Sequence, residues 1–353
     1  MRATRRFRAV NQMSVLIFLA LGALLPLVVT SPYWHSLFIV IGLYTMLGVG
    51  LALLMGYAGQ VSLGQPAFYG LGAYTAAILT TRLTLNPWLA LVAGIVVASL
   101  MAVLIGVPLF YLRGHALAMG TLALTLIFYV LVNETVALTL GPSGITGIPT
   151  LTIGPFAFDS DVRYYYLVLV AVSAVLFVSL RLVNSHIGRA LRAIRDSELA
   201  AETMGVDTAR HKRLVFIIAA AFAGLAGGLY AFYLHFVSPP PFSFGLSAVL
   251  ITMVVVGGLA SVWGSMVGVA AVTLLTEAIR SLAAPLAGQS SAEYQIVVYG
   301  LLLMVIMIFF PDGLGRTIID RVAASSLSPG PSPKMGEGGP ESSPPSSRAG
   351  RKG

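Results

Sequence analysis

Long apolar runs fill most of this chain, and one long polar segment, residues 185–213, interrupts them. Runs of about 20 apolar residues have the length that an α-helix needs to cross the hydrocarbon core of a bilayer. Charged residues make up only 10% of the chain, whereas they make up about 25% of a soluble domain. The sequence therefore predicts an all-α, polytopic integral membrane protein and excludes an ordinary soluble fold.

The apolar runs predict about ten transmembrane spans. They lie at about residues 13–30, 37–55, 56–79, 87–112, 117–140, 164–183, 214–236, 246–259, 264–282 and 294–310. A basic stretch, residues 1–12, precedes the first run as in a signal peptide, but bulky residues stand where a cleavage site needs small ones. We therefore expect an uncleaved first span, a transmembrane domain at 13–311, and a disordered Ser/Pro/Gly-rich tail at 312–353.

The positive charges predict the topology. With the N-terminus in the cytoplasm, eighteen of the 21 Lys and Arg residues lie on the cytoplasmic side, and only Arg82, Arg163 and Arg280 lie on the other. An even number of spans returns the C-terminus to the basic side. Both termini and the polar segment are therefore predicted to be cytoplasmic. The same bias explains the net charge of +8 without a nucleic-acid partner.

The polar segment has the pattern of short helices. It is rich in good helix formers, and Asp196 or Ser197 is placed to cap a second helix with Glu198 and Glu202 in its first turns. Gly205 is placed to end that helix. One face then carries Leu199, Ala200, Thr203 and Met204. Such a helix suits insertion into a groove of a soluble partner, and a solvated or lipid-surface helix explains the pattern equally well.

A second polar group lies within an apolar run. Residues 56–79 are rich in glycine and small residues and hold Gln60, Ser62 and Gln65. Non-helical backbone at membrane depth is tolerated where protein buries it or where it lines a cavity. The segment is therefore a tight helix–loop–helix turn or a broken, pathway-lining segment, and small residues also favour close helix packing. The three side chains are candidates for a translocation pathway.

Glu134 and Glu277 are the carboxylates nearest to the bilayer interior, which makes them further candidates for a pathway. Both lie near the outer ends of their predicted spans, and Arg280 follows Glu277 at a spacing that favours an ion pair. The sequence has no P-loop, no HExxH motif and no cysteine, and its histidines are isolated. We therefore expect no catalytic site, no metal and no cofactor bound by this chain.

Four blocks, at residues 56–74, 141–149, 185–207 and 242–269, resemble in sequence and order the permease subunits of branched-chain amino acid ABC importers. The resemblance covers about residues 42–316.

The third block is similar to the EAA-x3-G coupling motif of ABC importers. Ala200, Ala201 and Gly205 match it, but Leu199 stands in the place of the glutamate and Glu198 comes one residue earlier. The family's LPE motif is LTE at residues 275–277, so the resemblance predicts the loss of a proline kink there.

The resemblance implies a type II ABC-importer-like permease of the bacterial inner membrane. It implies a second permease subunit, two cytoplasmic ATPases that use ATP, and a periplasmic substrate-binding protein. The residues implied in coupling to the ATPases are Arg192, Arg195, Asp196, Glu198, Ala200, Ala201 and Gly205. Urea and short-amide permeases are close relatives of the family. An ion-coupled secondary transporter or channel and an integral-membrane lipid-group transferase are the alternatives outside it.

Overall fold

The structure is a computed structural model, and it describes residues 14–287 except 27–28, 30, 111 and 113. The chain divides into the units Met1–Thr317 and Ile318–Gly353, and all described residues belong to the first. The predicted basic N-terminus, the predicted span at 294–310 and the predicted disordered tail lie outside the described residues.

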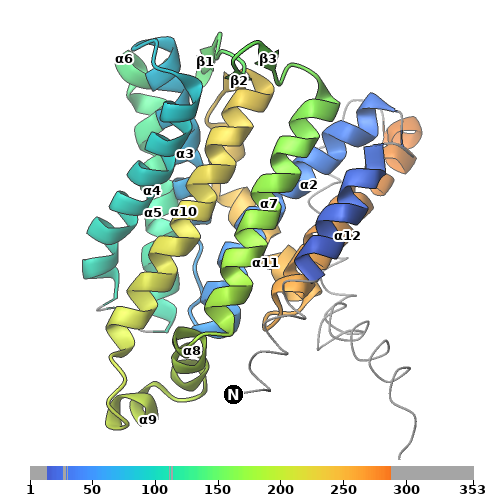
Figure 1. Ribbon diagram of the computed structural model, residues 1–353. Helices are drawn as coiled ribbons and strands as arrows, with labels where there is room; N and C mark the ends of the chain where they lie inside the picture. Colours follow the sequence, from blue (N-terminus) through green and yellow to red (C-terminus); the bar gives the residue numbers. More distant parts are fainter. Residues whose placement is uncertain (1–13, 27–28, 30, 111, 113, 288–353) are drawn as a thin grey trace, which may run out of the picture. The chain divides into compact units, whose positions relative to one another are not determined.

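Helices dominate the described part (Figure 1). A first helix, Ser14–Pro26, precedes α2. The other α-helices are α2 (Pro32–Ala52), α3 (Gln65–Thr81), α4 (Pro87–Leu109), α5 (His115–Glu134), α6 (Val136–Thr139), α7 (Asp161–Val183), α8 (His186–Asp196), α9 (Glu198–Thr203), α10 (Thr208–Leu234), α11 (Phe244–Gly257) and α12 (Val262–Ala287). The π-helix η1 (Leu53–Tyr57) continues α2, and η2 (Gly141–Ser143) and η3 (Pro240–Phe242) are short 3-10 turns.

The membrane-helix prediction is confirmed in its general form. By length and composition, five described helices can cross a membrane, or six if the pair Phe244–Gly257 and Val262–Ala278, bent by 119°, is one broken span. Three predicted spans contain shorter helices: Ser14–Pro26, α3 with 17 residues, and α11 with 14 residues, which is also the first half of the bent pair. The number ten stays a prediction, because these helices are short and the last predicted span is not described.

Four two-residue strands depart from the all-α prediction. β1 (Ile145–Thr146) pairs antiparallel with β4 (Phe236–Val237), and β2 (Thr152–Ile153) pairs antiparallel with β3 (Phe156–Ala157). Strands of this length leave no alternation for a sequence to show.

The strands and α8–α9 lie at opposite ends of the bundle (Figure 1). We call these the strand end and the loop end. The described basic residues of the loop end are Arg181, Arg189, Arg192, Arg195, Arg210, Lys212 and Arg213. Those of the strand end are Arg82, after α3, and Arg163, bonded to Asp159 near β3. The described charges are therefore divided between the ends as the topology prediction requires.

The centre of the bundle is α3, α4 and α10, which pack closely against one another. A Cβ atom added to Gly72 would lie 2.2 Å from the carbonyl oxygen of Gly224, so only glycine permits this approach of α3 to α10. In a bilayer, small residues at such contacts are what let helices gain packing energy. This core holds the broken segments described below in fixed positions.

Candidate functional site

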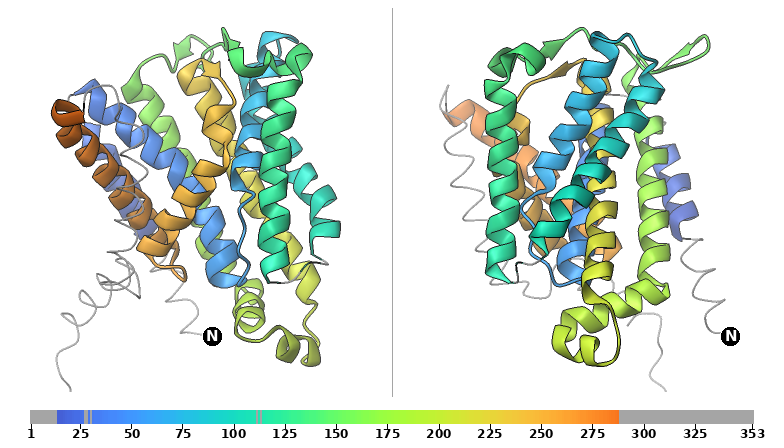
Figure 2. Two further views of the ribbon diagram at one scale, coloured as in Figure 1. Left: turned by 180° about the vertical axis from the view of Figure 1, so that it is seen from behind. Right: turned by 90° about the vertical axis from the view of Figure 1, so that its left-hand side faces the viewer.

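The candidate site lies around a break that follows α2. The helix passes into the π-turn η1, residues 58–64 then form a connection without regular secondary structure, and α3 begins at Gln65 (Figure 2). A Cβ atom on Gly56 would lie 1.5 Å from the carbonyl oxygen of Leu259, so η1 is pressed against the turn between α11 and α12. Residues 56–79 thus contain a non-helical stretch between two helices.

Side chains from two other helices satisfy the backbone groups of Leu63 in this connection. The Leu63 amide donates to Thr121 Oγ1 at 2.9 Å, and the Leu63 carbonyl accepts from Thr125 Oγ1 at 2.7 Å and from Ser247 Oγ at 2.8 Å. These partners belong to α5 and α11. Unpaired backbone groups are costly at membrane depth, so these three hydroxyls are what permit the break.

Sequence reasoning missed these three residues. Thr121 and Thr125 are spaced at i, i+4 on an otherwise apolar helix, which was a usable signal for a polar face. Ser247 gave no comparable signal, because nothing in a single sequence joins it to Leu63.

The predicted pathway residues Gln60, Ser62 and Gln65 are brought together and buried, with at most 4% of each exposed. Ser62 Oγ accepts a hydrogen bond from the Gly64 amide at 3.4 Å. Gln60 Nε2 and Gln65 Oε1 have no partner among the described residues. A buried polar group left unpaired costs about 1–3 kcal/mol. The two amides are therefore groups that a polar solute or water can stabilise.

Two half-helices begin next to each other at this break. Ser247, in the first turn of α11, bonds to Leu63, which lies two residues before the first residue of α3. Since helix N-termini carry partial positive charge, two such ends face a common region. This is a local field that favours an anionic group.

A cavity of about 490 Å³ lies beside the start of α11, between α2 and α12. Its polar lining residues are Tyr44, Ser243, Thr273, Thr276 and Glu277, and its apolar walls include Leu37, Val40, Leu246 and Val249. Thr273 Oγ1 is buried with no partner among the described residues. The cavity thus combines apolar walls with a few polar groups, as small-solute sites do.

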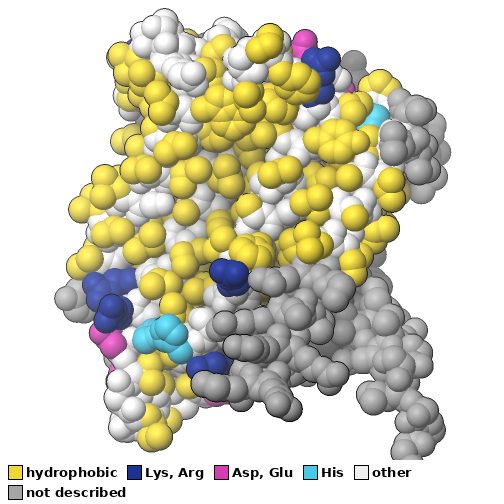
Figure 3. Space-filling view, viewed as in Figure 1, with side chains coloured by type: hydrophobic (Ala, Val, Ile, Leu, Met, Phe, Trp, Pro, Cys, Tyr) yellow, Lys and Arg dark blue, Asp and Glu magenta, His cyan; other side chains and the backbone are white. Residues whose placement is uncertain are grey.

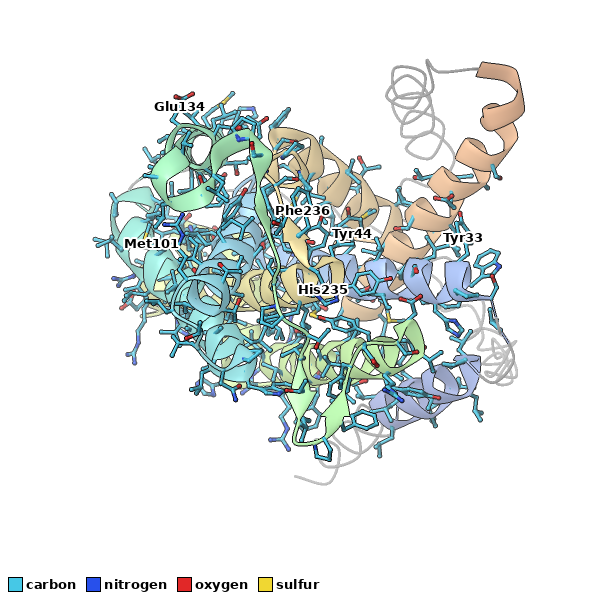
Figure 4. The ribbon with its side chains drawn as sticks, turned by 90° about the horizontal axis from the view of Figure 1, so that it is seen from above. Tyr33, Tyr44, Met101, Glu134, His235 and Phe236 are labelled. Atoms are coloured by element: carbon cyan, nitrogen blue, oxygen red, sulfur yellow. The ribbon has the colours of Figure 1, made fainter. Side chains whose placement is uncertain are left out.

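Glu277 and Glu134 lie in different places. Glu277 is half-buried in the cavity lining and accepts a hydrogen bond from the Tyr33 hydroxyl, which Figure 4 shows next to α12. The predicted partner Arg280 has a side chain outside the described residues. Glu134 is exposed at the end of α5, at the opposite edge from Tyr33 in Figure 4. The structure therefore brings Glu277, but not Glu134, to the cavity.

The loop end is built as the sequence predicts, with Ser197 rather than Asp196 capping α9. Ser197 Oγ accepts from the Ala200 amide at 3.3 Å, and Gly205 follows the helix at φ +81°. Glu198 pairs with Lys212 at 2.7 Å, which fastens α9 to α10. The two helices of the loop are therefore held by their own caps and by one partly buried ion pair.

Arg195 joins the loop end to the break. Its Nη1 donates to the Gly56 carbonyl at 2.9 Å, and it also contacts Asp196 Oδ1 at 3.2 Å. A Cβ atom on Gly59 would lie 3.2 Å from Arg195 Cγ, so the Arg195 side chain also packs on the non-helical connection at residues 58–64. Arg192 donates to the Val183 carbonyl at 3.3 Å, at the end of α7. Among the predicted coupling residues, Arg195 is thus the one that touches the break.

The residues that the sequence placed on one face of α9 are exposed in the structure: Leu199, Ala200, Thr203 and Met204. Ala201, on the opposite side, is only 3% exposed and faces its own protein. Leu199 and Met204 are 72% and 85% exposed. Asp196 and Ala200 are exposed, and Glu198 is half-buried. The reason is the fastening to α10, which turns the face that holds Ala201 inward and leaves two large apolar side chains in solvent.

In the described part of the chain, no group of three or more His, Cys, Asp or Glu residues could hold a metal ion.

Known proteins with similar sequences point to one family of membrane transport proteins. A family model described as the permease component of branched-chain amino acid transport systems matches residues 33–307. The chain is 34% identical over 295 residues to the high-affinity branched-chain amino acid transport system permease protein LivM of Escherichia coli strain K12, and the match covers 77% of this chain and 67% of LivM. It is 26% identical over 297 residues to the corresponding protein LivH of the same strain, covering 79% of this chain and 93% of LivH.

A more distant relative has a different solute in its name. The guanosine ABC transporter permease protein NupQ of Bacillus subtilis strain 168 is 24% identical over 190 residues, which are 49% of this chain and 59% of NupQ. No solved structure matches the chain.

Proposed function

The chain belongs to the permease-component family of branched-chain amino acid transport systems, and we propose that it is one of two different membrane subunits of an ATP-driven importer. The cargo is a branched-chain amino acid or a related small solute. The contact between Arg195 and Gly56 carries the proposal, because it ties an exposed loop to a broken segment inside the bundle. A transporter that is driven from outside the membrane needs such a link.

The proposed complex follows from the relatives. Escherichia coli K12 has both LivM and LivH, and this chain resembles each of them, so a second permease chain completes the membrane part. Two ATPase subunits supply ATP hydrolysis, and a periplasmic binding protein delivers the solute. The loop end is the cytoplasmic end of an inner-membrane protein with ten spans, because it holds most of the described basic residues.

The exposed pair Leu199 and Met204 is the proposed contact with an ATPase. Exposed large apolar side chains on a short, well-capped helix suit a groove on a soluble partner. Movement of α9 then reaches α8 directly, and Arg195 transmits it to η1 and the non-helical connection that follows it. An interrupted helix changes shape more readily than a regular one, since fewer backbone hydrogen bonds need to break.

The cavity beside α11 is the proposed path of the solute. Its apolar walls suit an aliphatic side chain, and its hydroxyls and the Glu277 carboxylate suit the polar end of an amino acid. Gln60 and Gln65 flank Leu63, which bonds to Ser247 of α11, and their unpaired amides become available to the solute when the break opens. Glu134 has no role in the proposed solute path, because that residue is exposed away from the cavity.

The function is tested by reconstituting the chain with its partner permease, ATPases and binding protein in proteoliposomes. We expect ATP-dependent uptake of labelled leucine, with urea and guanosine as competing solutes. Leu199→Asp with Met204→Asp should reduce recovery of the ATPases with the membrane subunits by at least roughly tenfold, since charge replaces apolar contact. Ala193→Asp, which adds a negative charge at an exposed position of α8 outside the predicted coupling residues, is the matched control. Uptake by this chain alone under an ion gradient, without ATP, would overturn the proposal.

A further inference from the structure

A second hollow lies at the loop end, in a groove of about 640 Å³ between α4, α10 and the junction of α7 with α8. Its walls are aliphatic and come from three sides of the groove. They are Ala102, Val103, Val107, Leu182, Ile187, Leu214, Ile217 and Ile218. Arg210 and Arg213 are the charged residues that line it. No part of the proposed transport mechanism uses this groove.

The sequence of α10 places the two charges at one end of the groove. Arg210, Arg213, Leu214, Ile217 and Ile218 follow the spacing i, i+3, i+4, i+7, i+8, so they share one helix face. Along this face the guanidinium groups lie at the end nearer the loop, and the aliphatic side chains extend into the bundle. The face is therefore amphipathic along its length, with cations at the membrane surface and apolar groups at depth.

The two arginines are available to a ligand. Both are exposed, and among the described residues neither forms an ion pair. Arg213 Nε donates to the Ala209 carbonyl at 3.3 Å, which leaves its remaining guanidinium donors open. Their neighbour Lys212 differs, because it is half-buried and paired with Glu198 at 2.7 Å. The contrast within one turn of α10 shows that only the groove side carries uncompensated positive charge.

The groove also borders the surface that faces the membrane interior. Next to Val103 and Val107, the outer face of α4 carries Val96, Leu100 and Leu104, which are 55%, 64% and 67% exposed. In Figure 3 such apolar surface covers the middle of the bundle, and basic side chains gather toward the loop end. An occupant of the groove therefore meets lipid chains on one side and the aqueous boundary at the arginines.

We infer that this groove binds one anionic phospholipid, with its phosphate between Arg210 and Arg213 and an acyl chain along α4 and α10. Arginine is well suited to a phosphate because its planar fork donates two parallel hydrogen bonds. Basic pockets between membrane helices on the cytoplasmic side recognise anionic headgroups in this way. A free phosphate ion would use only the arginines and leave the aliphatic walls uncovered, so the lipid is the occupant that uses the whole groove.

The test measures lipid retained by the purified full-length chain in detergent, by native mass spectrometry. Phosphatidylglycerol and phosphatidylcholine with identical acyl chains are offered in parallel, and inorganic phosphate is offered as a third arm. We expect phosphatidylglycerol to be retained more tightly than phosphatidylcholine, by roughly tenfold or more, because each Arg near a membrane surface contributes about a fivefold gain in binding to anionic lipid.

Variants distinguish lipid retention by the groove from retention by positive charge elsewhere on the surface. Arg210→Gln with Arg213→Gln should remove the preference for phosphatidylglycerol. Arg181→Gln with Arg189→Gln makes the same charge change at exposed positions outside the groove lining and should keep the preference. Val107→Trp should lower retention of both lipids by filling the groove without a change of charge. A monodisperse chromatographic profile confirms that each variant is folded.

Four results would overturn the inference. Equal retention of the two lipids by the unmodified protein is the first. Equal losses in the two double variants, or binding of inorganic phosphate with the same dependence on Arg210 and Arg213, would assign the effect to charge alone. Release of the bound lipid when the ATPase subunits are added would assign the groove to a protein interface.

Discussion

The two polar stretches of this chain, α8–α9 at the loop end and the broken segment around residues 53–65, solve opposite problems. Helix α9 is exposed and is held by its own cap and by the Glu198–Lys212 pair, while Arg195 of α8 bonds to the Gly56 carbonyl. The break is buried, and the Leu63 backbone depends on hydroxyls from α5 and α11, while two side-chain amides stay unpaired. A helix held by local contacts can move as a unit, whereas a segment that depends on distant partners can rearrange.

The largest effect is expected from a change at Gly56, where Arg195 of the loop contacts the break. In Gly56→Val, the new Cβ atom would lie only 1.5 Å from the Leu259 carbonyl oxygen. Because the obstacle is backbone, we expect a loss of stability of about 3 kcal/mol and little folded protein. The measurement is the thermal midpoint and the yield of the detergent-purified protein.

Gly245→Ala is the matched control for Gly56→Val. The added methyl group there meets only Ser243 Oγ at 3.6 Å, an ordinary contact, and the thermal midpoint should change little. A Gly56→Val protein as stable as the unmodified one would show that η1 and the α11–α12 turn are not in close contact.

The loop was largely predictable from the sequence, and the break was not. Ser197, Glu198 and Gly205 are local signals, since a cap acts within three or four residues of itself. The break depends on contacts between residues far apart in the sequence, and Ser247 lies 184 positions from Leu63. A single sequence shows that residues 56–79 are polar and glycine-rich, but not which hydroxyls approach them.

The contacts that orient α9 on α10 could not be predicted from the sequence, for the same reason. Helix periodicity places Leu199, Ala200, Thr203 and Met204 on one face, but it cannot say which face turns inward. The contact of Glu198 with Lys212, across the turn into α10, decides that Ala201 is buried. The groove at Arg210 and Arg213 likewise appears only when α4 and α10 are side by side.

A change at Arg195 tests whether its contact with Gly56 transmits movement independently of ATPase binding by α9. Arg195→Ala removes the hydrogen bond to the Gly56 carbonyl, and we expect ATP-driven uptake to fall about tenfold, since a hydrogen bond from a charged donor contributes about 1.5–3 kcal/mol. ATP hydrolysis by the partner subunits should continue, because the outward face of α9 is unchanged. Both rates are measured in the same proteoliposomes.

Arg189→Ala is the control for Arg195→Ala, because Arg189 is exposed on the same helix, α8. It should leave both rates unchanged. Equal loss of uptake and hydrolysis on Arg195→Ala would mean that this residue holds the complex together instead of transmitting movement.

A third prediction concerns the unpaired amides of the break. Gln60→Leu or Gln65→Leu replaces a buried polar group without a full set of partners, so stability should stay constant or rise by about 1 kcal/mol. Uptake should nevertheless fall several-fold if these amides serve the solute. Opposite changes in thermal midpoint and uptake rate are the expected signature.

Ser179→Ala is the control for the glutamine variants, because Ser179 Oγ is also buried without a partner but lies on α7, outside the break. It should show the same tolerance in stability and no loss of uptake. Glutamine variants with normal uptake would assign Gln60 and Gln65 to packing.

The smallest expected effect tests whether α9 can fray without disturbing the break. Ser197→Ala removes the cap of α9, which contributes about 1 kcal/mol to such a helix. Because the Glu198–Lys212 pair still holds α9 on α10, fraying should stay local and uptake should fall by no more than about twofold. Amide hydrogen exchange should quicken over residues 198–205 and nowhere in α10. Asp196→Ala, which breaks only the exposed contact with Arg195, should leave that exchange unchanged. If exchange also quickened in the break around Gly56, the stability of the break would depend on α9, and the two stretches would have to be treated as one unit.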